Sequence, residues 1–254
     1  MNYEKILQGI LDIGEEMIVC GAEVSRVEDS IRRMCMAYGA NKDRINVFII
    51  TSNIQVTIAA PDGHIITQIR QIIRYDVNFD RLDYLNDLSR YVCEHTPDHI
   101  KIQELLRRVM ERPTPGRAVK LLGSVLVAAA FAVFFGGSLR DGMSAGIMGI
   151  VIVFMEDVMQ KRETNQIVYN FIVSVVAGIT AILTVTLGLG ENENLIMMGG
   201  IMILIPGIAM TNAVRDMLIG DIATGMLRLT NAVLTAAAIA CGFALSIILL
   251  GGVL

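Results

Sequence analysis

Hydrophobic residues follow two different patterns along this chain of 254 residues, and the pattern changes near position 120. Before that position, apolar side chains recur at helical spacing or alternate with polar ones. After it, they form long stretches with few charges. Lysine and arginine number 16 and aspartate and glutamate 17 up to position 120, against 5 and 8 beyond it. The chain therefore combines a polar region with a region suited to the interior of a membrane.

The polar region, residues 1–115, is predicted to be a small cytoplasmic α+β domain. Apolar residues at helical spacing predict two helices, which end at Gly21 and Gly39. The segment 44–60 is rich in Ile, Val and Thr, and it is followed by a turn at 61–64 and a short apolar run at 65–69. These features predict two or three antiparallel strands.

Two further helices are predicted at the end of the polar region. Asp80 is expected to cap the first of them, and Thr96-Pro97 to open the second over 98–110. His95 and His99 have the spacing of a metal pair on a helix, but the proline between them should separate their faces. We therefore interpret this segment as a solvated loop and expect no metal site.

The second region, residues 116–254, is predicted to be a bundle of about five transmembrane helices, so the fold class is a mainly α membrane protein. Each apolar stretch is close to the ~20 residues needed to cross ~30 Å of hydrocarbon. Small residues four positions apart predict close helix packing at Gly142 and Gly146, Ala128 and Ala132, Ala177 and Ala181, and Ala236, Ala240 and Ala244. The expected spans are 121–139, 143–159, 167–189, 195–214 and 229–250.

The basic residues between these spans predict the orientation. Basic residues precede the first span, Lys161 and Arg162 follow the second, and Arg215 and Arg228 flank the link between the fourth and fifth. Arg140 lies in a loop on the opposite side. By the positive-inside rule, the N-terminus is cytoplasmic and the C-terminus lies outside, as expected for a multi-pass membrane protein.

Composition excludes several classes of function. Neither region is basic, so nucleic acid is not an expected partner. The four cysteines lie far apart without a CxxC pair, which is typical of free thiols in a reducing compartment. The chain has no GxSxG, no P-loop and no GxGxxG after a strand. We expect neither an enzyme nor a bound cofactor.

The fourth predicted span is interrupted by Pro206-Gly207. The interruption lies about eleven residues into the span, or roughly 16 Å along a helix axis. Proline lacks the backbone donor, and the resulting half-helix end is the kind of feature with which transporters hold ions or substrates. The alternative is an ordinary proline kink.

Polar residues follow the interruption. Asn212 and Asp216 share one helical face, and Thr211 and Arg215 share the next. Arg215 suits a carboxylate from a solute or another helix, whereas Asp216 and Asp221 are candidates to carry protons or a cation. The alternative is a group of juxtamembrane charges that sets topology.

Two more carboxylates, Glu156 and Asp157, end the second predicted span. If that helix begins at Met143 it is short, and both carboxylates lie inside the hydrocarbon region, where such groups mark ion pathways. The alternative is that the helix slides towards the cytoplasm.

In the polar region, the segment Gly21-Ala22-Glu23-Val24-Ser25-Arg26-Val27-Glu28-Asp29 places Arg26 within helical reach of Glu23 and Asp29. These residues are expected to form ion pairs on a solvated helix face.

Taken together, these motifs resemble the threonine/serine exporter (ThrE) family over nearly the whole chain. Gly21, Glu23, Arg26 and Glu28 belong to the matching motif of the polar region. The residues that carry the resemblance are GAEVSRVED with Arg32-Arg33 and Gly39, then Gly63, Thr67 and Arg70, and in the membrane region Pro206-Gly207, Thr211-Asn212, Arg215-Asp216, Gly220-Asp221, Gly225 and Arg228.

The chain is similar to the branch in which the exporter is split, and it matches the YjjP-like subunit that bears the cytoplasmic domain. The resemblance implies secondary export of small hydrophilic metabolites, with threonine and serine in some members and succinate in the split enterobacterial pair. It also implies a separate five-span membrane subunit (YjjB-like) as partner, and transport driven by the proton motive force.

Two other classes of function remain open from the residues alone. One is a membrane-tethered hydrolase formed by the polar region, although a nucleophile motif is missing. The other is a sensor or scaffold subunit whose polar domain binds a regulator or metabolite.

Overall fold

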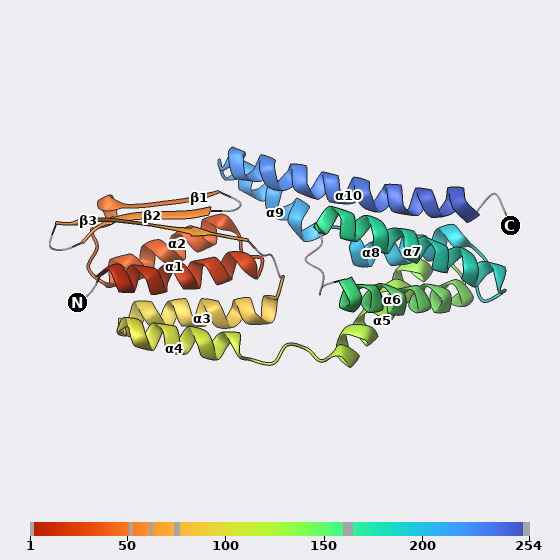
Figure 1. Ribbon diagram of the computed structural model, residues 1–254, viewed down its shortest axis with the longest axis horizontal. Coiled ribbons are helices and arrows are strands. Elements are labelled where there is room, and N and C mark those ends of the chain that lie inside the picture. The colour runs from red at the N-terminus through yellow and green to blue at the C-terminus, as the bar shows by residue number, and fades with distance from the viewer. Residues whose placement is uncertain (1–2, 51–52, 61–62, 74–76, 160–164, 251–254) are drawn as a thin grey trace. The chain divides into compact units, whose positions relative to one another are not determined.

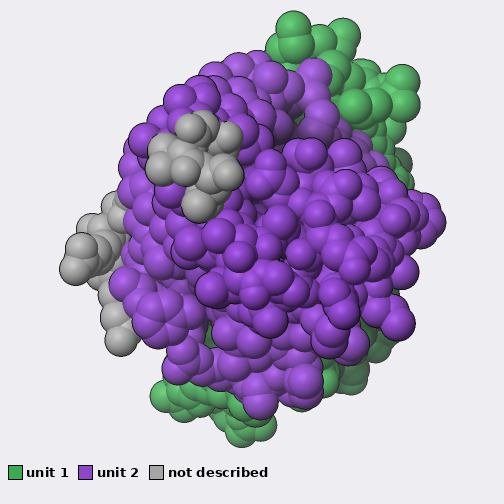
Figure 2. All heavy atoms as spheres, turned by 90° about the vertical axis from the view of Figure 1, so that its right-hand side faces the viewer, with its two compact units in different colours: residues 1–113, 212–228 green, residues 114–211, 229–254 purple. Residues whose placement is uncertain are grey.

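The structure is a computed structural model that describes residues 3–50, 53–60, 63–73, 77–159 and 165–250. The chain forms two compact units, which Figure 2 colours green and purple. The first unit combines Met1–Pro113 with Asn212–Arg228, and the second combines Thr114–Thr211 with Leu229–Leu254. A short segment from the apolar half of the sequence therefore folds with the polar region.

Most of the first unit consists of three layers (Figure 1). Helices α1 (Tyr3–Val19) and α2 (Val24–Ala37) form the middle layer, and both are amphipathic. A sheet covers one side of this layer, and helices α3 (Phe79–His95) and α4 (His99–Met110) cover the other. The apolar faces of all three layers share one hydrophobic core. The expected α+β composition is therefore observed in this unit.

The sheet has three antiparallel strands in the order β1 (Ile45–Ile50), β2 (Asn53–Ala59) and β3 (Ile65–Gln71). A short 3-10 helix, η1 (Lys42–Arg44), precedes it. Alternate residues of β1 and β2 are buried against the helices, as the pattern of apolar positions requires. The predicted strands are confirmed, although Pro61 and Asp62 of the predicted turn lie outside the described residues.

Glycines end the first two helices as predicted. Gly21 has φ +94° and Gly39 has φ +89°, the left-handed conformation typical of a helix C-terminus. The predicted caps of the later helices are wrong by a few residues. Asn78 rather than Asp80 caps α3, and Asp98 caps α4 by accepting from the backbone N–H of Lys101.

Thr96 and Pro97 therefore do not open the last helix of the polar region. Thr96 has φ +41° and ends α3 instead. A side-chain oxygen one residue after the proline reaches the orphan amides of α4, so the helix begins later than predicted.

Within the described residues, four helices are long and apolar enough to cross a membrane: α5 (Arg117–Phe134), α6 (Leu139–Met159), α7 (Gln166–Thr186) and α10 (Ile222–Leu250). Helices α8 (Glu193–Leu204) and α9 (Gly207–Leu218) form a bent pair that would make a fifth span if it crosses as one. The chain is thus a multi-pass membrane protein. Lys161 and Arg162, used above for orientation, lie outside the described residues.

The turn between the first two apolar helices lies earlier than predicted. Helix α5 ends at Phe134 and α6 begins at Leu139, so α6 has 21 residues. Ser138 and Asp141 form a capping box that starts α6, because each side chain accepts from the other's backbone N–H. The prediction of a short second span beginning at Met143 is therefore wrong.

Small residues bring the helices of the second unit together. A Cβ added to Gly149 would lie 2.8 Å from the carbonyl oxygen of Ser124, and one added to Gly242 would lie 2.6 Å from that of Phe171. The predicted packing residues Ala128, Ala132, Ala177 and Ala181 are fully buried. The prediction is wrong for α10, where Ala240 and Ala244 are exposed and Gly242, Phe243 and Ser246 form the buried face.

Candidate functional site

The interrupted span predicted from Pro206-Gly207 is present. Helices α8 and α9 are bent by 55° relative to each other. Pro206 has no N–H for the carbonyl of Met202, and the N–H of Gly207 bonds to Ile205 at 2.8 Å. The carbonyls of Met202 and Ile203 thereby lose the amide partners that a continuous helix would provide. Backbone oxygens are left at the end of α8.

After the break, α9 turns back into α10 within the first unit. Gly220 has φ +100° and allows the sharp turn. Gly225 permits close contact between the helices, because a Cβ there would lie 2.7 Å from the carbonyl oxygen of Ala213 and 2.9 Å from the nitrogen of Met217. We call residues 212–228 the charged hairpin.

Asp216 is the buried charge of this hairpin. One carboxylate oxygen pairs with Nη1 of Arg228 at 3.1 Å, and the side chains are 0% and 15% exposed. The other oxygen, Oδ1, is buried and has no hydrogen-bond donor among the described residues. A buried carboxylate with one free acceptor is costly unless a proton, a cation or a ligand completes it.

Arg215 faces a different partner. Its Nη1 lies 2.8 Å from Oε1 of Glu23, which stands at the N-cap position of α2. Glu23 makes no side-chain bond to the helix amides and turns to Arg215 instead. The two sequence neighbours Arg215 and Asp216 thus have separate partners, as their positions around the helix predict.

The hairpin also contacts the sheet. The buried hydroxyl of Thr224 donates to the carbonyl oxygen of Ile49 at 3.4 Å. Asp221 accepts from the N–H of Thr224 at 3.4 Å and lies at the N-terminus of α10. Asp221 therefore acts as a helix cap, a structural role that the sequence alone did not indicate.

The remaining predicted residues of this segment lie in α9. The hydroxyl of Thr211 bonds to the carbonyl oxygen of Gly207 within its own helix at 2.9 Å. Asn212 is half-buried. The structure thus assembles Arg215, Asp216 and Asp221 with Glu23 in the first unit, a combination that joins residues nearly two hundred positions apart in sequence.

Glu156 and Asp157 lie in the second unit and are ion-paired there. Lys120 Nζ lies 2.6 Å from Glu156, and Arg117 Nε lies 2.8 Å from Asp157. Both pairs join the start of α5 to the end of α6. They place these carboxylates near helix termini, where a basic residue accompanies each one.

The predicted ion pairs around Arg26 are wrong. Asp29 pairs with Arg33 at 2.8 Å, and Glu28 pairs with Arg32 at 3.1 Å. Arg32 also donates to the carbonyl oxygen of Ile45 and so ties α2 to β1. These pairings use the i, i+4 direction with the acid first, which is the favourable order on a helix.

Sequence reasoning missed Asp141, a buried carboxylate in α6. Its Oδ1 accepts from the backbone N–H groups of Glu191 and Asn192 at 2.7 and 2.9 Å, and its Oδ2 accepts from Ser138. The spacing Ser138-Leu139-Arg140-Asp141 is a capping-box signal that could have identified it. Its contacts with residues fifty positions away could not have been read from the sequence.

The described residues contain no group of three His, Cys, Asp or Glu side chains that could hold a metal ion. In the first unit, the candidate site therefore consists of ion pairs and one carboxylate oxygen without a donor among the described residues; the helix break is a separate feature of the second unit. Such groups form ion pairs and hydrogen bonds that can exchange partners.

These features define the class as a multi-pass membrane protein with charged groups on its interrupted helix. The family model of ThrE, "Putative threonine/serine exporter", matches residues 8–250. The chain belongs to this family.

Two curated relatives are similar over most of the chain. A threonine/serine exporter of Corynebacterium glutamicum is 24% identical over 241 residues, covering 92% of this chain and 49% of the relative. A probable threonine/serine exporter of Mycobacterium tuberculosis is 20% identical over 248 residues, covering 97% of this chain and 46% of the relative. The chain thus spans about half the length of these relatives. No solved structure matches it.

Proposed function

We propose that this chain is one subunit of a secondary-active exporter of small hydrophilic metabolites, either threonine and serine or a dicarboxylate such as succinate. Transport is driven by the proton motive force. Family membership and the names of the two relatives support the exporter class. The protein resides in the bacterial inner membrane with its N-terminus in the cytoplasm and its C-terminus outside.

The observation that carries this proposal is that Oδ1 of Asp216 is buried without a hydrogen-bond donor among the described residues. Arg228 already neutralises the carboxylate on one side. A proton or a solute donor that binds Oδ1 weakens the ion pair between Asp216 and Arg228, so Asp216 can exchange one partner for another. This is the coupling group we assign to the exporter.

Arg215 supplies the complementary contact. Its side chain is 61% exposed, and its Nη1 forms an ion pair with Oε1 of Glu23 at 2.8 Å. A solute carboxylate is able to replace Glu23, because an exposed ion pair is held by only about 0.2–1 kcal/mol. In the second unit, the break at Pro206 and Gly207 leaves carbonyls of α8 without their helical amide partners, and we propose these as a separate contact for a solute ammonium or hydroxyl. Glu156 and Asp157 are further candidates for the ion pathway.

A second subunit completes the exporter. The curated relatives are about twice as long as the region that this chain matches. We infer a separate five-span membrane protein (YjjB-like) as the partner, and we propose that the two subunits form a higher oligomer. If this chain has five spans, a second half would run in inverted orientation, and solute sites form between such repeats.

The test is efflux of labelled threonine, serine and succinate from cells that express this chain with and without its partner. Asp216→Asn and Arg215→Ala should lower efflux at least about tenfold while the protein still accumulates in the membrane. Arg107→Gln is the matched control, since Arg107 is 70% exposed and contacts Glu111 at 3.6 Å. Normal efflux from both site variants would reject this assignment.

A further inference from the structure

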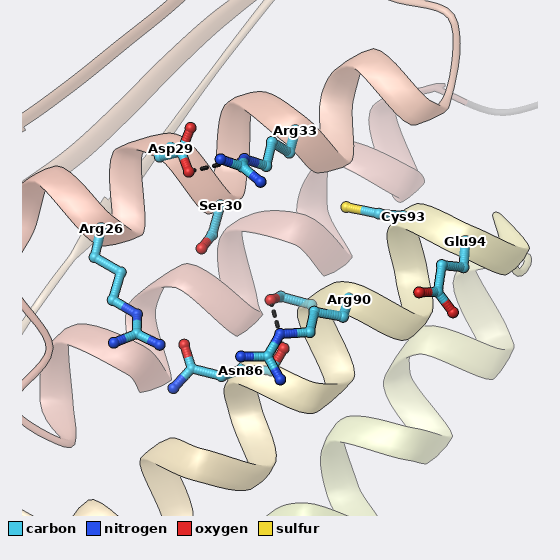
Figure 3. Close-up of a pocket in the computed structure, with 9 residues that line it drawn as sticks. Arg26, Asp29, Ser30, Arg33, Asn86, Arg90, Cys93 and Glu94 are labelled. Atoms are coloured by element: carbon cyan, nitrogen blue, oxygen red, sulfur yellow. Dashed lines mark hydrogen bonds and ion pairs between the residues drawn. The ribbon is translucent and has the colours of Figure 1, made fainter.

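A pocket of about 290 Å³ lies between α2 and α3 in the polar region (Figure 3). All of its lining residues come from these two helices. They include three arginines, two carboxylates, two serines and an asparagine. None of them belongs to the charged hairpin, so the pocket is distinct from the transport site proposed above.

The lining residues recur at helical spacing on both α2 and α3. On α2, Arg26, Asp29, Ser30 and Arg33 follow the spacing i, i+3, i+4, i+7, which places them on one stripe. On α3, Asn86, Ser89, Arg90 and Cys93 follow the same spacing. Two packed helices normally turn apolar stripes towards each other. Here two polar stripes enclose a cavity.

Two of the three arginines that line the pocket form ion pairs among the described residues, and the third does not. Arg33 pairs with Asp29 at 2.8 Å, and Arg90 pairs with Asp87 at 2.9 Å. Arg26 has no ion pair or hydrogen bond within the part of the chain that the structure describes. Figure 3 shows its guanidinium extending from α2 towards Asn86 on α3. One arginine therefore remains available to an anion.

Buried polar groups line the same pocket as that arginine. Asn86 and Ser89 are each 7% exposed. Asn86 donates its amide to the carbonyl oxygen of Leu82, and the hydroxyl of Ser89 donates to the carbonyl oxygen of Asn86. Their bonds hold both side chains in place, while the amide oxygen of Asn86 and the lone pairs of Ser89 still accept hydrogen bonds. Ser30 adds another hydroxyl to the wall of the pocket.

The thiol in the lining, Cys93, is not suited to catalysis. Burial raises the pKa of the Cys93 thiol, Glu94 and Asp29 raise it further, and Arg33 lowers it by less than burial raises it. The thiol is protonated at neutral pH and is a poor nucleophile. The chemistry of the pocket is therefore that of a binding site.

We propose that this pocket binds a small monocarboxylate metabolite, an amino acid or hydroxy acid, with its carboxylate on Arg26 and its other polar groups on Ser30, Asn86 and Ser89. A guanidinium holds a carboxylate through two parallel hydrogen bonds. A single charge fits better than a multivalent anion, because the other two arginines are paired and Asp29 and Glu94 also line the pocket. The polar region is thereby a sensor of cytoplasmic solute.

The test is isothermal titration calorimetry of the full chain in detergent with threonine, serine, succinate and inorganic phosphate as separate probes. The choice of the first two probes rests on the proposed function; the carboxylate chemistry does not. We expect saturable binding of threonine or serine, weakened at least about tenfold by Arg26→Gln. Arg26 is exposed, so this change should leave the fold intact.

Two controls separate the pocket from other sites. Arg107→Gln removes an exposed arginine of α4 outside the pocket and should leave the affinity unchanged. The titrations are also made in an Arg215→Ala background, which removes the proposed transport contact, so that the binding tested there by Arg26→Gln is that of the pocket. Three results would overturn the pocket assignment: binding that survives Arg26→Gln, binding of succinate or phosphate alone, or no binding of any probe. None of these results decides the exporter proposal, which the efflux experiment tests separately.

Discussion

Two buried carboxylates in different units of the molecule have contrasting surroundings. Asp141 is 2% exposed, and its two oxygens accept four hydrogen bonds, three of them from backbone N–H groups. Asp216 is also fully buried, but only one of its oxygens has a partner among the described residues, namely Arg228. Burial alone does not distinguish the two residues.

The difference lies in whether the surrounding chain completes the hydrogen bonds of the buried charge. Backbone amides cannot leave without unfolding the turn, so Asp141 is a fixed structural group. The guanidinium of Arg228 is on a flexible side chain and can move away from Asp216, and Oδ1 of Asp216 can accept a further hydrogen bond. Asp216 therefore has the freedom that a coupling group needs. The following predictions test this contrast, from the largest effect to the smallest.

Asp141→Ala should destabilise the protein by about 3–5 kcal/mol, because it leaves buried N–H groups without an acceptor. Thermal unfolding of the detergent-purified chain measures the loss. Glu191→Ala is the control: its side chain is 58% exposed and 3.8 Å from Arg140, so its removal should change stability by less than about 0.5 kcal/mol. Equal effects of the two changes would contradict a structural role for Asp141.

Arg228→Leu should cost about 3 kcal/mol, because it leaves Asp216 as an unpaired buried charge. Adding Asp216→Leu should restore most of that stability, since an apolar pair of similar size often replaces a buried ion pair at little cost. Efflux should stay absent in both variants. Denaturation and efflux measured side by side distinguish these outcomes, and transport by the double variant would exclude Asp216 as the coupling group.

Gly225→Ala should cost about 1–3 kcal/mol, because the added Cβ meets the backbone of α9 at Ala213 and Met217. Unfolding by denaturant checks this value. At Gly123 of α5, an added Cβ meets nothing within 4 Å, so Gly123→Ala should be neutral or slightly stabilising. If both substitutions behave alike, α9 and α10 are not in close contact at Gly225.

Arg215→Glu should lower stability by only about 0.2–1 kcal/mol, because the partner Glu23 lies in a partly exposed pair. Exchanging the two charges, with Glu23→Arg added to Arg215→Glu, should recover the loss. A double-mutant cycle measures this coupling. A coupling near zero would mean that Glu23 and Arg215 do not hold the hairpin to α2.

Much of the fold could be predicted because its signals are local. Alternation of Ile, Val and Thr predicted the strands, and glycines predicted the ends of α1 and α2. The helix boundaries near Thr96 and Ser138 were wrong because side-chain caps decide where a helix starts. The apolar stretches and the break at Pro206 were clear because burial in lipid and a missing backbone donor act on neighbouring residues.

The site was only partly predictable. Arg215 and Asp216 were identified as charges that need partners, but Glu23 and Arg228 were not assigned to them. Arg26 was expected to pair with Glu23 or Asp29 and instead lines a pocket. Helical spacing allows several pairings of similar energy, and the choice among them depends on which element lies opposite.

The sequence by itself determined which parts of this protein suit water and which suit lipid, where the apolar helices lie and where one of them breaks, because these properties depend on neighbouring residues. Only the tertiary structure decided that residues 212–228 fold with the polar region, that backbone amides donate to Asp141, and that one oxygen of Asp216 has no donor among the residues that the structure describes. Those outcomes depend on contacts between segments far apart in the chain, and no local pattern records them.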